Sequence, residues 1–262
     1  MPKVSIVTPS LNSCSTIVRT LQCIREQSYP DIEHFVIDGG STDETASVVG
    51  RFEPRSRYVL APGLNQAAAV NLGIGMAQGE VIGWLNADDY YLDREVVAKA
   101  VAALTQNPSV GLVYGDFVIV DEGCRVTSIY RAPEFSASRL SRYTYIAQPT
   151  IFVRKNVAAL EALREDLEFV LDSDWMIRLA RHAPFRRVPR FQAAFRQHSA
   201  SKIHILGAAL YRKEDRELRR TSANEKGRLA RAALRASDRV VQLRSRLLGE
   251  LAGRALRTGQ GK

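Results

Sequence analysis

The sequence contains little cysteine and no long apolar run. Its three cysteines, Cys14, Cys23 and Cys124, form an odd set without the spacing of metal ligands, which favours a reducing compartment over a disulfide framework. No stretch reaches the roughly 18 consecutive apolar residues of a membrane-spanning helix. The first ten residues, MPKVSIVTPS, lead directly into a strand-like pattern without the features of a cleavable signal peptide. These absences argue against a secreted or membrane-spanning protein, and we expect a cytoplasmic one.

Charge is distributed unevenly along an otherwise ordinary globular composition. Of the 262 residues, 45% are apolar and 25% are charged, enough apolar chain for a sizeable core. Residues 1–204 carry 22 basic and 22 acidic side chains, whereas residues 205–262 carry 15 basic and 6 acidic ones. The net charge of +9 therefore belongs to the C-terminal part. We predict a catalytic domain over 1–204 and a basic amphipathic helical tail over 205–262.

Short apolar runs alternate with helix-like segments through the first half of the chain. Strands are predicted over 3–8, 32–37, 58–61, 80–85 and 111–114, and helices over 13–27, 42–51, 66–77 and 93–105. Further on, we predict a hairpin over 116–131, a strand over 150–153, helices over 156–163 and 171–182, and extended chain over 187–195. Such alternation is typical of an α/β fold whose mainly parallel sheet is covered by helices on both faces.

Polar clusters stand where three of the predicted strands end. They are Thr8-Pro9-Ser10, the run from Asp38 to Asp43, and Asn86-Ala87-Asp88-Asp89. Ligands of open parallel sheets bind beyond the carboxyl ends of the strands, so all three clusters should face one crevice. Adjacent carboxylates repel each other unless a cation lies between them, and Mg²⁺ or Mn²⁺ prefers such oxygen ligands. On its own, however, the acidic pair is explained equally well by a solvated turn.

Six stretches of the sequence, in order, resemble one family. They are VSIVTPSLNS with IDGGSTDET, NLGIGMAQGEVIGWLNADDYYLD, VYGDFVIVDEGCRV, AQPTIFVRK, LDSDWMIRLA and AFRQHSASK, and they span roughly residues 3–202. Together they resemble glycosyltransferase family 2, the inverting enzymes with a Rossmann-like GT-A fold. The resemblance implies transfer of a sugar from a nucleotide-diphosphate donor to an acceptor hydroxyl in a single displacement.

The resemblance also implies roles for residues at the strand ends. Asp38 would contact the nucleotide base, with Pro9 lying against it. Asp88 would contact the ribose or the metal, and Asp89 would coordinate the Mg²⁺ or Mn²⁺ ion that bridges the diphosphate. The motif formed by Arg196 and His198 would reach the diphosphate or the metal, although a surface loop explains it equally well. A bound cation would neutralise the departing nucleoside diphosphate.

Two aspartates are candidates for the general base that an inverting transfer needs. Asp172 and Asp174 begin a predicted helix, and anchoring the family motif on its Arg-Leu-Ala end places Asp172 at the catalytic position. The acidic residue that precedes this position in the family is Leu171 here, so Asp174 stays as the second candidate. Either aspartate could instead simply cap the helix.

The sequence departs from the family pattern at several polar positions. The stretch from Gln66 to Asn71 stands where relatives often have Tyr-Asp-Ala-Met-Asn, and Asn86 replaces an aspartate that many relatives have. These differences bear on donor selectivity, and the resemblance makes UDP the commonest expectation. Gln148 precedes a strand in the region where related enzymes meet the acceptor, although a polar turn explains it equally well. We expect the acceptor to be a glycan or a lipid-linked molecule.

The tail admits two interpretations. Apolar residues recur at spacings of three or four from Leu229 to Leu251, beside a row of arginines. Such a helix could lie on the anionic inner face of the cytoplasmic membrane. Alternatively, it could pack on the domain or pair in a homodimer. No aromatic or fold-level signal supports nucleic-acid binding.

Two other functions remain open at this point. A nucleotidyltransferase would usually show a basic, glycine-rich loop after the first strand, and residues 9–13 contain no basic side chain. A non-catalytic protein that binds a nucleotide sugar, or that acts as a membrane scaffold, would share the binding residues but would not turn over a donor.

Overall fold

The structure of the protein, a computed structural model, describes residues 1–52, 56–199 and 201–224. Its strands are β1 (Val4–Ser10), β2 (Ile32–Asp38), β3 (Arg57–Leu60), β4 (Val81–Trp84), β5 (Tyr90–Tyr91), β6 (Leu112–Val120), β7 (Val126–Tyr130), β8 (Phe152–Arg154) and β9 (Phe185–Arg196). The helices are α1 (Ile17–Arg25), α2 (Thr45–Phe52), α3 (Gln66–Met76), α4 (Val96–Thr105), α5 (Ala137–Leu140), α6 (Lys155–Ala158), α7 (Leu171–Leu179), α8 (Lys202–Leu206) and α9 (Ala208–Asn224), with a 3₁₀ turn over Gln148–Thr150.

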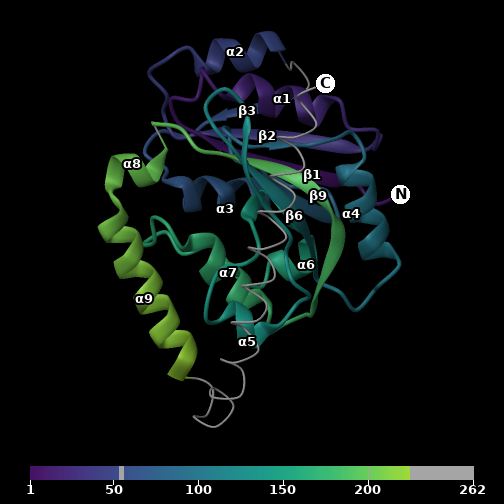
Figure 1. Cartoon of the computed structure of the whole chain (residues 1–262). Coiled ribbons are helices and arrows are strands. Elements are labelled where there is room, and N and C mark those ends of the chain that lie inside the picture. Colours follow the sequence, from purple (N-terminus) through teal and green to yellow (C-terminus); the bar gives the residue numbers. More distant parts are fainter. Residues whose placement is uncertain (53–55, 200, 225–262) are drawn as a thin grey trace, which may run out of the picture.

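One mixed sheet runs through the described part of the molecule (Figure 1). Its strand order is β3-β2-β1-β4-β8-β6-β9-β5, and β7 pairs with β6 outside this path. The pairs β1–β2, β2–β3, β1–β4 and β6–β9 are parallel, while β8 runs antiparallel between β4 and β6. The predicted α/β fold with a mainly parallel sheet is confirmed.

Helices cover both faces of the β1–β2 region, as Figure 1 shows. Val36 packs with residues of α1 and α2, whereas its neighbours Phe35 and Ile37 pack with residues of α3. Alternate residues of a strand point to opposite faces, so these strands are apolar on both sides. A Cβ atom on Gly73 of α3 would overlap the side chain of Val7. The absence of that Cβ lets α3 lie directly on β1.

Several element boundaries differ from the sequence prediction. The strand expected over 111–114 and the first half of the hairpin form the single strand β6, because this chain continues its pairing with β9 beyond Tyr114. The first two helices begin later, at Ile17 and Thr45, since the residues before them form the loops at the ends of β1 and β2. The helix expected over 156–163 is reduced to α6, and the one expected over 171–182 ends at Leu179.

The tail is described only in its first part. Residues 205–224 contain the end of α8 and the whole of α9, which packs against the protein body through the buried Leu218 and Ser222. The predicted apolar stripe from Leu229 to Leu251 lies outside the described residues. The division of the chain at residue 204 therefore stays a prediction. Among the helices that the structure describes, none has both the length and the apolar character needed to cross a membrane.

Candidate active site at the strand ends

The loops that follow β1 and β2 are joined by hydrogen bonds. Asn12, whose φ is +49°, donates its backbone N–H to Ser41 Oγ at 2.7 Å, and its Oδ1 accepts the N–H of Thr42 at 2.9 Å. Gly40 adopts a φ of +106°, a conformation that disfavours a residue with a side chain. The two predicted polar clusters are therefore one continuous polar rim beside the sheet.

Asp38 organises this rim from a buried position. Its Oδ1 accepts the backbone N–H groups of Gly40 at 2.8 Å and Ser41 at 2.6 Å, and its Oδ2 accepts the hydroxyl of Tyr58 at 2.8 Å. Asp38 is 0% exposed. The carboxylate thus holds the loop in shape, and its Oδ2, which accepts only the Tyr58 hydroxyl among the described residues, keeps one acceptor site for a further donor.

Pro9 and Ser10 lie at the end of β1, next to Asp38. Both residues are buried, and they pair with Ile37 and Asp38 of β2 in the parallel register. The Oγ of Ser10 is buried without a hydrogen-bond partner. Buried hydroxyls are normally paired, so this atom is a candidate for contact with a bound molecule.

Asp43 supplies the cap for α2. Its carboxylate accepts the backbone N–H groups of Thr45 at 2.9 Å and Cys14 at 3.1 Å. Burial alone would raise the pKa of Asp43, but hydrogen bonds from Thr45 and Cys14 outweigh it and lower the pKa to about 2. The carboxylate is consequently charged at neutral pH and suits the positive end of the helix.

The acidic pair that follows β4 has one buried and one accessible member. Asp89 is 0% exposed, and its Oδ1 accepts the backbone N–H of Arg196 at 3.0 Å. Burial, and next the charge of Asp88, raise the pKa of Asp89 well above its ordinary value. The side chain of Asp88 is 31% exposed, and its Oδ2 lies 3.0 Å from Nε2 of His198. The predicted residues Asp88, Asp89, Arg196 and His198 are thus brought together.

Asp88 and His198 form a hydrogen-bonded pair whose side chains are of a kind that could hold a divalent cation. Two ligands that each lie about 2.1 Å from an octahedral ion, at right angles, are about 3 Å apart, which matches the observed separation of these two side chains. Within the described residues, no group of three or more His, Cys, Asp or Glu side chains could hold an ion by itself. Carboxylate oxygen and imidazole nitrogen both suit Mn²⁺, and Mg²⁺ commonly completes its shell with substrate phosphates and water.

The guanidinium of Arg196 is buried beside this pair. Its Nη2 donates to Cys124 Sγ at 3.3 Å, and the group lies 5.7 Å from the ring centroid of Tyr90. Its Nε is buried without a partner. A cation with an unused donor can bind an anion, although only 6% of Arg196 is exposed.

A chain of polar side chains runs from the acidic pair to the start of α7. Asn86 donates to Gln148 Oε1 and accepts from Gln66 Nε2, both at 2.9 Å. The Oε1 of Gln66 in turn accepts from Lys202 Nζ at 3.0 Å. The same ammonium group donates to the backbone oxygen of Glu168 at 2.9 Å. Lys202 therefore joins the loop after β4 to the segment that precedes α7.

The two candidate bases differ in their surroundings. Asp174 accepts from Nε of Arg178 at 2.8 Å, and Arg164 lies 3.9 Å from its other oxygen. Asp172 forms no comparable ion pair with the residues that the structure describes, and its Oδ1 accepts the N–H of Ser173 at 2.6 Å. Burial raises the pKa of Asp172, with hydrogen bonds from Ser173 and the charge of Arg219 acting in the opposite direction. Asp174 is therefore a partner of two arginines, whereas Asp172 has the raised pKa that suits a general base.

Sequence reasoning did not assign roles to Gln66 or Glu168. Gln66 was visible as a departure from the family pattern, and Lys202 as the last residue of the AFRQHSASK stretch, which contains the motif of Arg196 and His198. The contact between Gln66 and Lys202 joins positions 136 residues apart in the sequence, so no local spacing could have predicted it.

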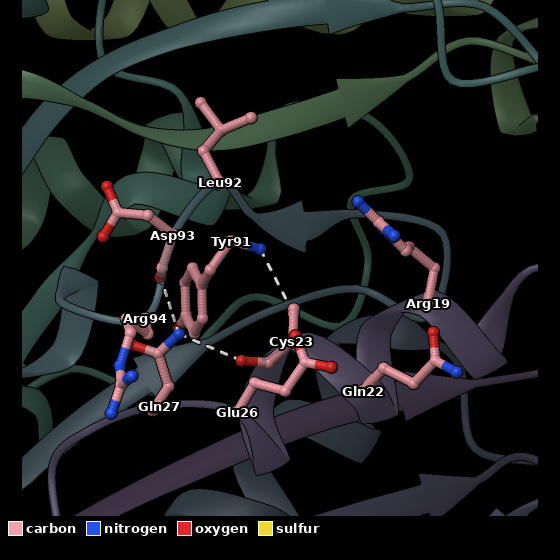
Figure 2. A pocket seen from close by; sticks show the side chains of 9 residues that line it. All are labelled: Arg19, Gln22, Cys23, Glu26, Gln27, Tyr91, Leu92, Asp93 and Arg94. Atoms are coloured by element: carbon pink, nitrogen blue, oxygen red, sulfur yellow. Dashed lines mark hydrogen bonds between the residues drawn. The ribbon is translucent and has the colours of Figure 1, made fainter.

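A small pocket lies elsewhere, between the end of α1 and the segment around β5 (Figure 2). It has a volume of about 80 Å³, and none of the predicted site residues lines it. Gln27 lines it and donates to the backbone oxygens of Cys23 at 2.9 Å and Asp93 at 2.8 Å. The N–H of Tyr91 donates to Cys23 Sγ. These bonds tie α1 to the chain that follows the acidic pair.

Comparison with known proteins identifies the family. The sequence profile described as "Glycosyl transferase family 2" matches residues 5–217. The chain belongs to this family. A PGL/p-HBAD biosynthesis glycosyltransferase of Mycobacterium bovis is 30% identical over 160 residues, and the chain spans 60% of that relative's length. The family profile extends beyond residue 204 and includes α9 as far as Glu217.

Solved structures of other glycosyltransferases share the fold. Residues 1–349 of Staphylococcus aureus TarS, in complex with UDP-GlcNAc, superpose with a TM-score of 0.63 at 18% identity, covering 76% of this chain and 60% of TarS 1–349. A mannosyltransferase from Pyrobaculum calidifontis, in complex with GDP-Man and Mn²⁺, gives a TM-score of 0.58 at 19% identity and covers 92% of this chain and 81% of the other. At such identities the likeness shows the GT-A glycosyltransferase fold alone.

Proposed function

We propose that this family 2 glycosyltransferase moves a sugar from a nucleotide-diphosphate donor to an acceptor hydroxyl with inversion, in one displacement. The observation that supports it best is the contact of Asp88 with His198 and of Asp89 with Arg196. These contacts bring anion-binding and cation-binding groups together at the end of β9. The family match favours this reaction over nucleotidyl transfer. The neighbours crystallised with UDP-GlcNAc and with GDP-Man make a nucleotide sugar the natural donor class, and UDP remains our first expectation.

We assign direct contact with Mg²⁺ or Mn²⁺ to Asp88 and His198. The family resemblance gave the ion contact to Asp89, with Asp88 and His198 as further possible ligands, but the Asp89 side chain is fully buried and its Oδ1 already accepts an N–H. Asp89 would instead fix the end of β9 so that His198 reaches Asp88. When bound, the cation would neutralise charge on the departing nucleoside diphosphate. Arg196, through its unpaired Nε, would add a second positive charge near the same oxygens.

Asp172 would act as the general base. Its carboxylate would accept the proton of the acceptor hydroxyl while the new glycosidic bond forms at the anomeric carbon and the bond to the diphosphate breaks. A raised pKa makes a carboxylate a better proton acceptor at neutral pH. Asp38 and Asn12 would shape the nucleoside pocket, with Pro9 along its floor.

A thermal-shift panel tests the donor class. We expect one nucleoside diphosphate among UDP, GDP and dTDP to raise the melting temperature, and Mn²⁺ to increase the effect, because specific ligands stabilise the folded state by mass action. CMP serves as the control nucleotide. A flat response to every nucleotide would argue for the non-catalytic scaffold. Slow donor hydrolysis without acceptor would separate an enzyme from a nucleotide-sugar-binding protein.

The acceptor and the location are also proposals. We propose a glycan or lipid-linked acceptor at an anionic membrane surface. Residues 205–262 carry 15 basic and only 6 acidic side chains, and this positive charge supports the membrane location. Sedimentation with vesicles of anionic and of neutral lipid tests this directly. Binding to anionic vesicles alone would support it. A homodimer without vesicle binding would favour the packing interpretation of the tail.

A further inference from the structure

Helix α9 contacts the two segments that surround the proposed base. Figure 1 shows it lying beside α7. Glu214 reaches from α9 to the turn that leads into α7, and Arg219 reaches to the chain after α5. Both residues lie in the part of the chain that the charge distribution alone assigned to a separate tail.

Glu214 binds the entrance of α7 through backbone groups. Its carboxylate accepts the N–H groups of Glu168 at 3.1 Å, Phe169 at 2.9 Å and Val170 at 3.3 Å. The residue at the N-cap of α7 is Val170, whose side chain cannot accept a hydrogen bond. A carboxylate near the beginning of a helix is also favoured by the helix dipole. Glu214 thus supplies from another helix the anchoring that the sequence of α7 lacks.

Arg219 reaches α7 through the end of α5 and the chain that follows it. Its Nη1 donates to the backbone oxygen of Leu140 at 2.8 Å, and its Nη2 donates to Thr144 Oγ1 at 2.7 Å. Thr144 Oγ1 lies 2.7 Å from Ser173 Oγ, on the residue next to Asp172. The side chain of Arg219 is only 14% exposed, so solvent screens its charge weakly.

We propose that Glu214 and Arg219 of α9 are positioning residues for Asp172, so that α9 belongs to the catalytic unit. The proposal depends on the assignment of Asp172 as the base. Glu214 would keep α7 at the orientation in which the carboxylate meets the acceptor hydroxyl, and Arg219 would keep that carboxylate ionised.

The charged groups around Asp172 give the sign of the pH effect. Arg219, which also pairs with Asp215 of α9 at 2.9 Å, lowers the pKa of Asp172 against the effect of burial. Tyr211, also on α9, faces it too, but its own pKa is raised above the ordinary tyrosine value, so it stays neutral in this range. Removing the charge of Arg219 should therefore raise the pKa of Asp172 further. The acidic limb of kcat, the pH range over which kcat falls as Asp172 takes up a proton, would then move to higher pH.

The decisive experiment compares pH profiles of three full-length variants. Arg219→Gln should move the acidic limb of kcat upward by roughly 0.5–1 pH unit, while the affinity for the donor nucleotide stays unchanged. Arg219→Lys should restore most of the wild-type limb because it keeps the charge. The matched control is Arg220→Gln, which removes an equal charge from an exposed neighbour paired with Glu217, and it should leave the limb in place.

Glu214→Gln provides a second readout if Arg219→Gln does not fold. An amide oxygen replaces the carboxylate that serves three N–H groups, so kcat should fall roughly tenfold at temperatures well below melting, with the donor KM unchanged. The proposal would be overturned if Arg219→Gln left the acidic limb of kcat unshifted or if Arg220→Gln shifted it equally. A Glu214→Gln enzyme with normal kcat would also overturn it. Full turnover by Asp172→Asn would instead overturn the assignment of the base itself.

Discussion

His198 Nε2 lies 3.0 Å from Asp88 Oδ2, although the two residues are 110 positions apart in the sequence. The contact forms because β9 ends beside the loop that follows β4, where the backbone of Arg196 is held by Asp89. A family signature near residue 88 and a short motif near residue 198 are thereby joined in one place. The arrangement gives Asp88 and Asp89 separate tasks.

The first prediction concerns these two aspartates. Asp88→Asn should abolish the part of donor binding that depends on Mn²⁺ and leave the melting temperature of the free protein nearly unchanged, because Asp88 is partly exposed. Asp89→Ala should instead lower the melting temperature, since it removes the acceptor of a buried hydrogen bond that fixes β9. Calorimetry with and without Mn²⁺, together with thermal melting of each free variant, distinguishes the two. Equal effects of both substitutions on metal-dependent binding would contradict the division of tasks.

The second prediction concerns Lys202, which joins Gln66 to Glu168. Lys202→Met should reduce kcat/KM for transfer about tenfold, because the loop after β4 and the start of α7 lose their common partner. The matched control is Lys213→Met on α9, an exposed residue, which should behave as the wild type. Steady-state kinetics with the donor identified by the thermal-shift panel measures both. A wild-type rate in Lys202→Met would show that the chain of polar contacts is dispensable.

The third prediction concerns acid stability and His34. This residue is buried in β2 between Thr8 and Ser56, and burial lowers its pKa from 6.5 to about 3. Below pH 6.5 the unfolded chain binds a proton at His34 that the folded protein does not, so stability falls as pH falls from 6.5 towards 3. Between pH 6.5 and 5 the loss is ~2 kcal/mol.

Denaturant unfolding at several pH values measures this loss. His34→Gln cannot titrate, so its free energy of unfolding should change less between pH 6.5 and 5 than that of the wild type. His198 and every other titrating group are the same in both proteins, and the difference between them isolates His34. Parallel curves for the two proteins would contradict the account.

Local sequence patterns were sufficient for the fold class and for the positions of the polar clusters. Short apolar runs that alternate with helix-like segments predicted the sheet, and the common crevice at the strand ends stays a prediction. The difference in exposure between Asp88 and Asp89 could not be predicted from the sequence, because it depends on where β9 ends. The cap that Glu214 provides was equally hidden, since α7 and α9 are far apart in the sequence.

The helix of the candidate bases shows the same limit. Spacing placed Asp172 and Asp174 on one turn, two residues apart, and left both as candidates. What separates them is the side chain of Arg178, one turn further along α7, together with Arg164 from the preceding loop. An (i, i+4) Asp–Arg pair is a favourable arrangement on a helix, and it explains Asp174 without a catalytic role.

The most direct test of the central claim is turnover of Asp172→Asn and Asp174→Asn, measured side by side with saturating donor and acceptor. The account predicts that Asp172→Asn binds the donor as tightly as the wild type but loses about 10²–10⁴-fold in kcat, because an amide cannot accept the acceptor proton. Asp174→Asn should melt at a lower temperature, since it loses the charge paired with Arg178, and should still turn over below that temperature. The account would be contradicted by wild-type turnover in Asp172→Asn. It would also be contradicted if only Asp174→Asn lost turnover while remaining folded.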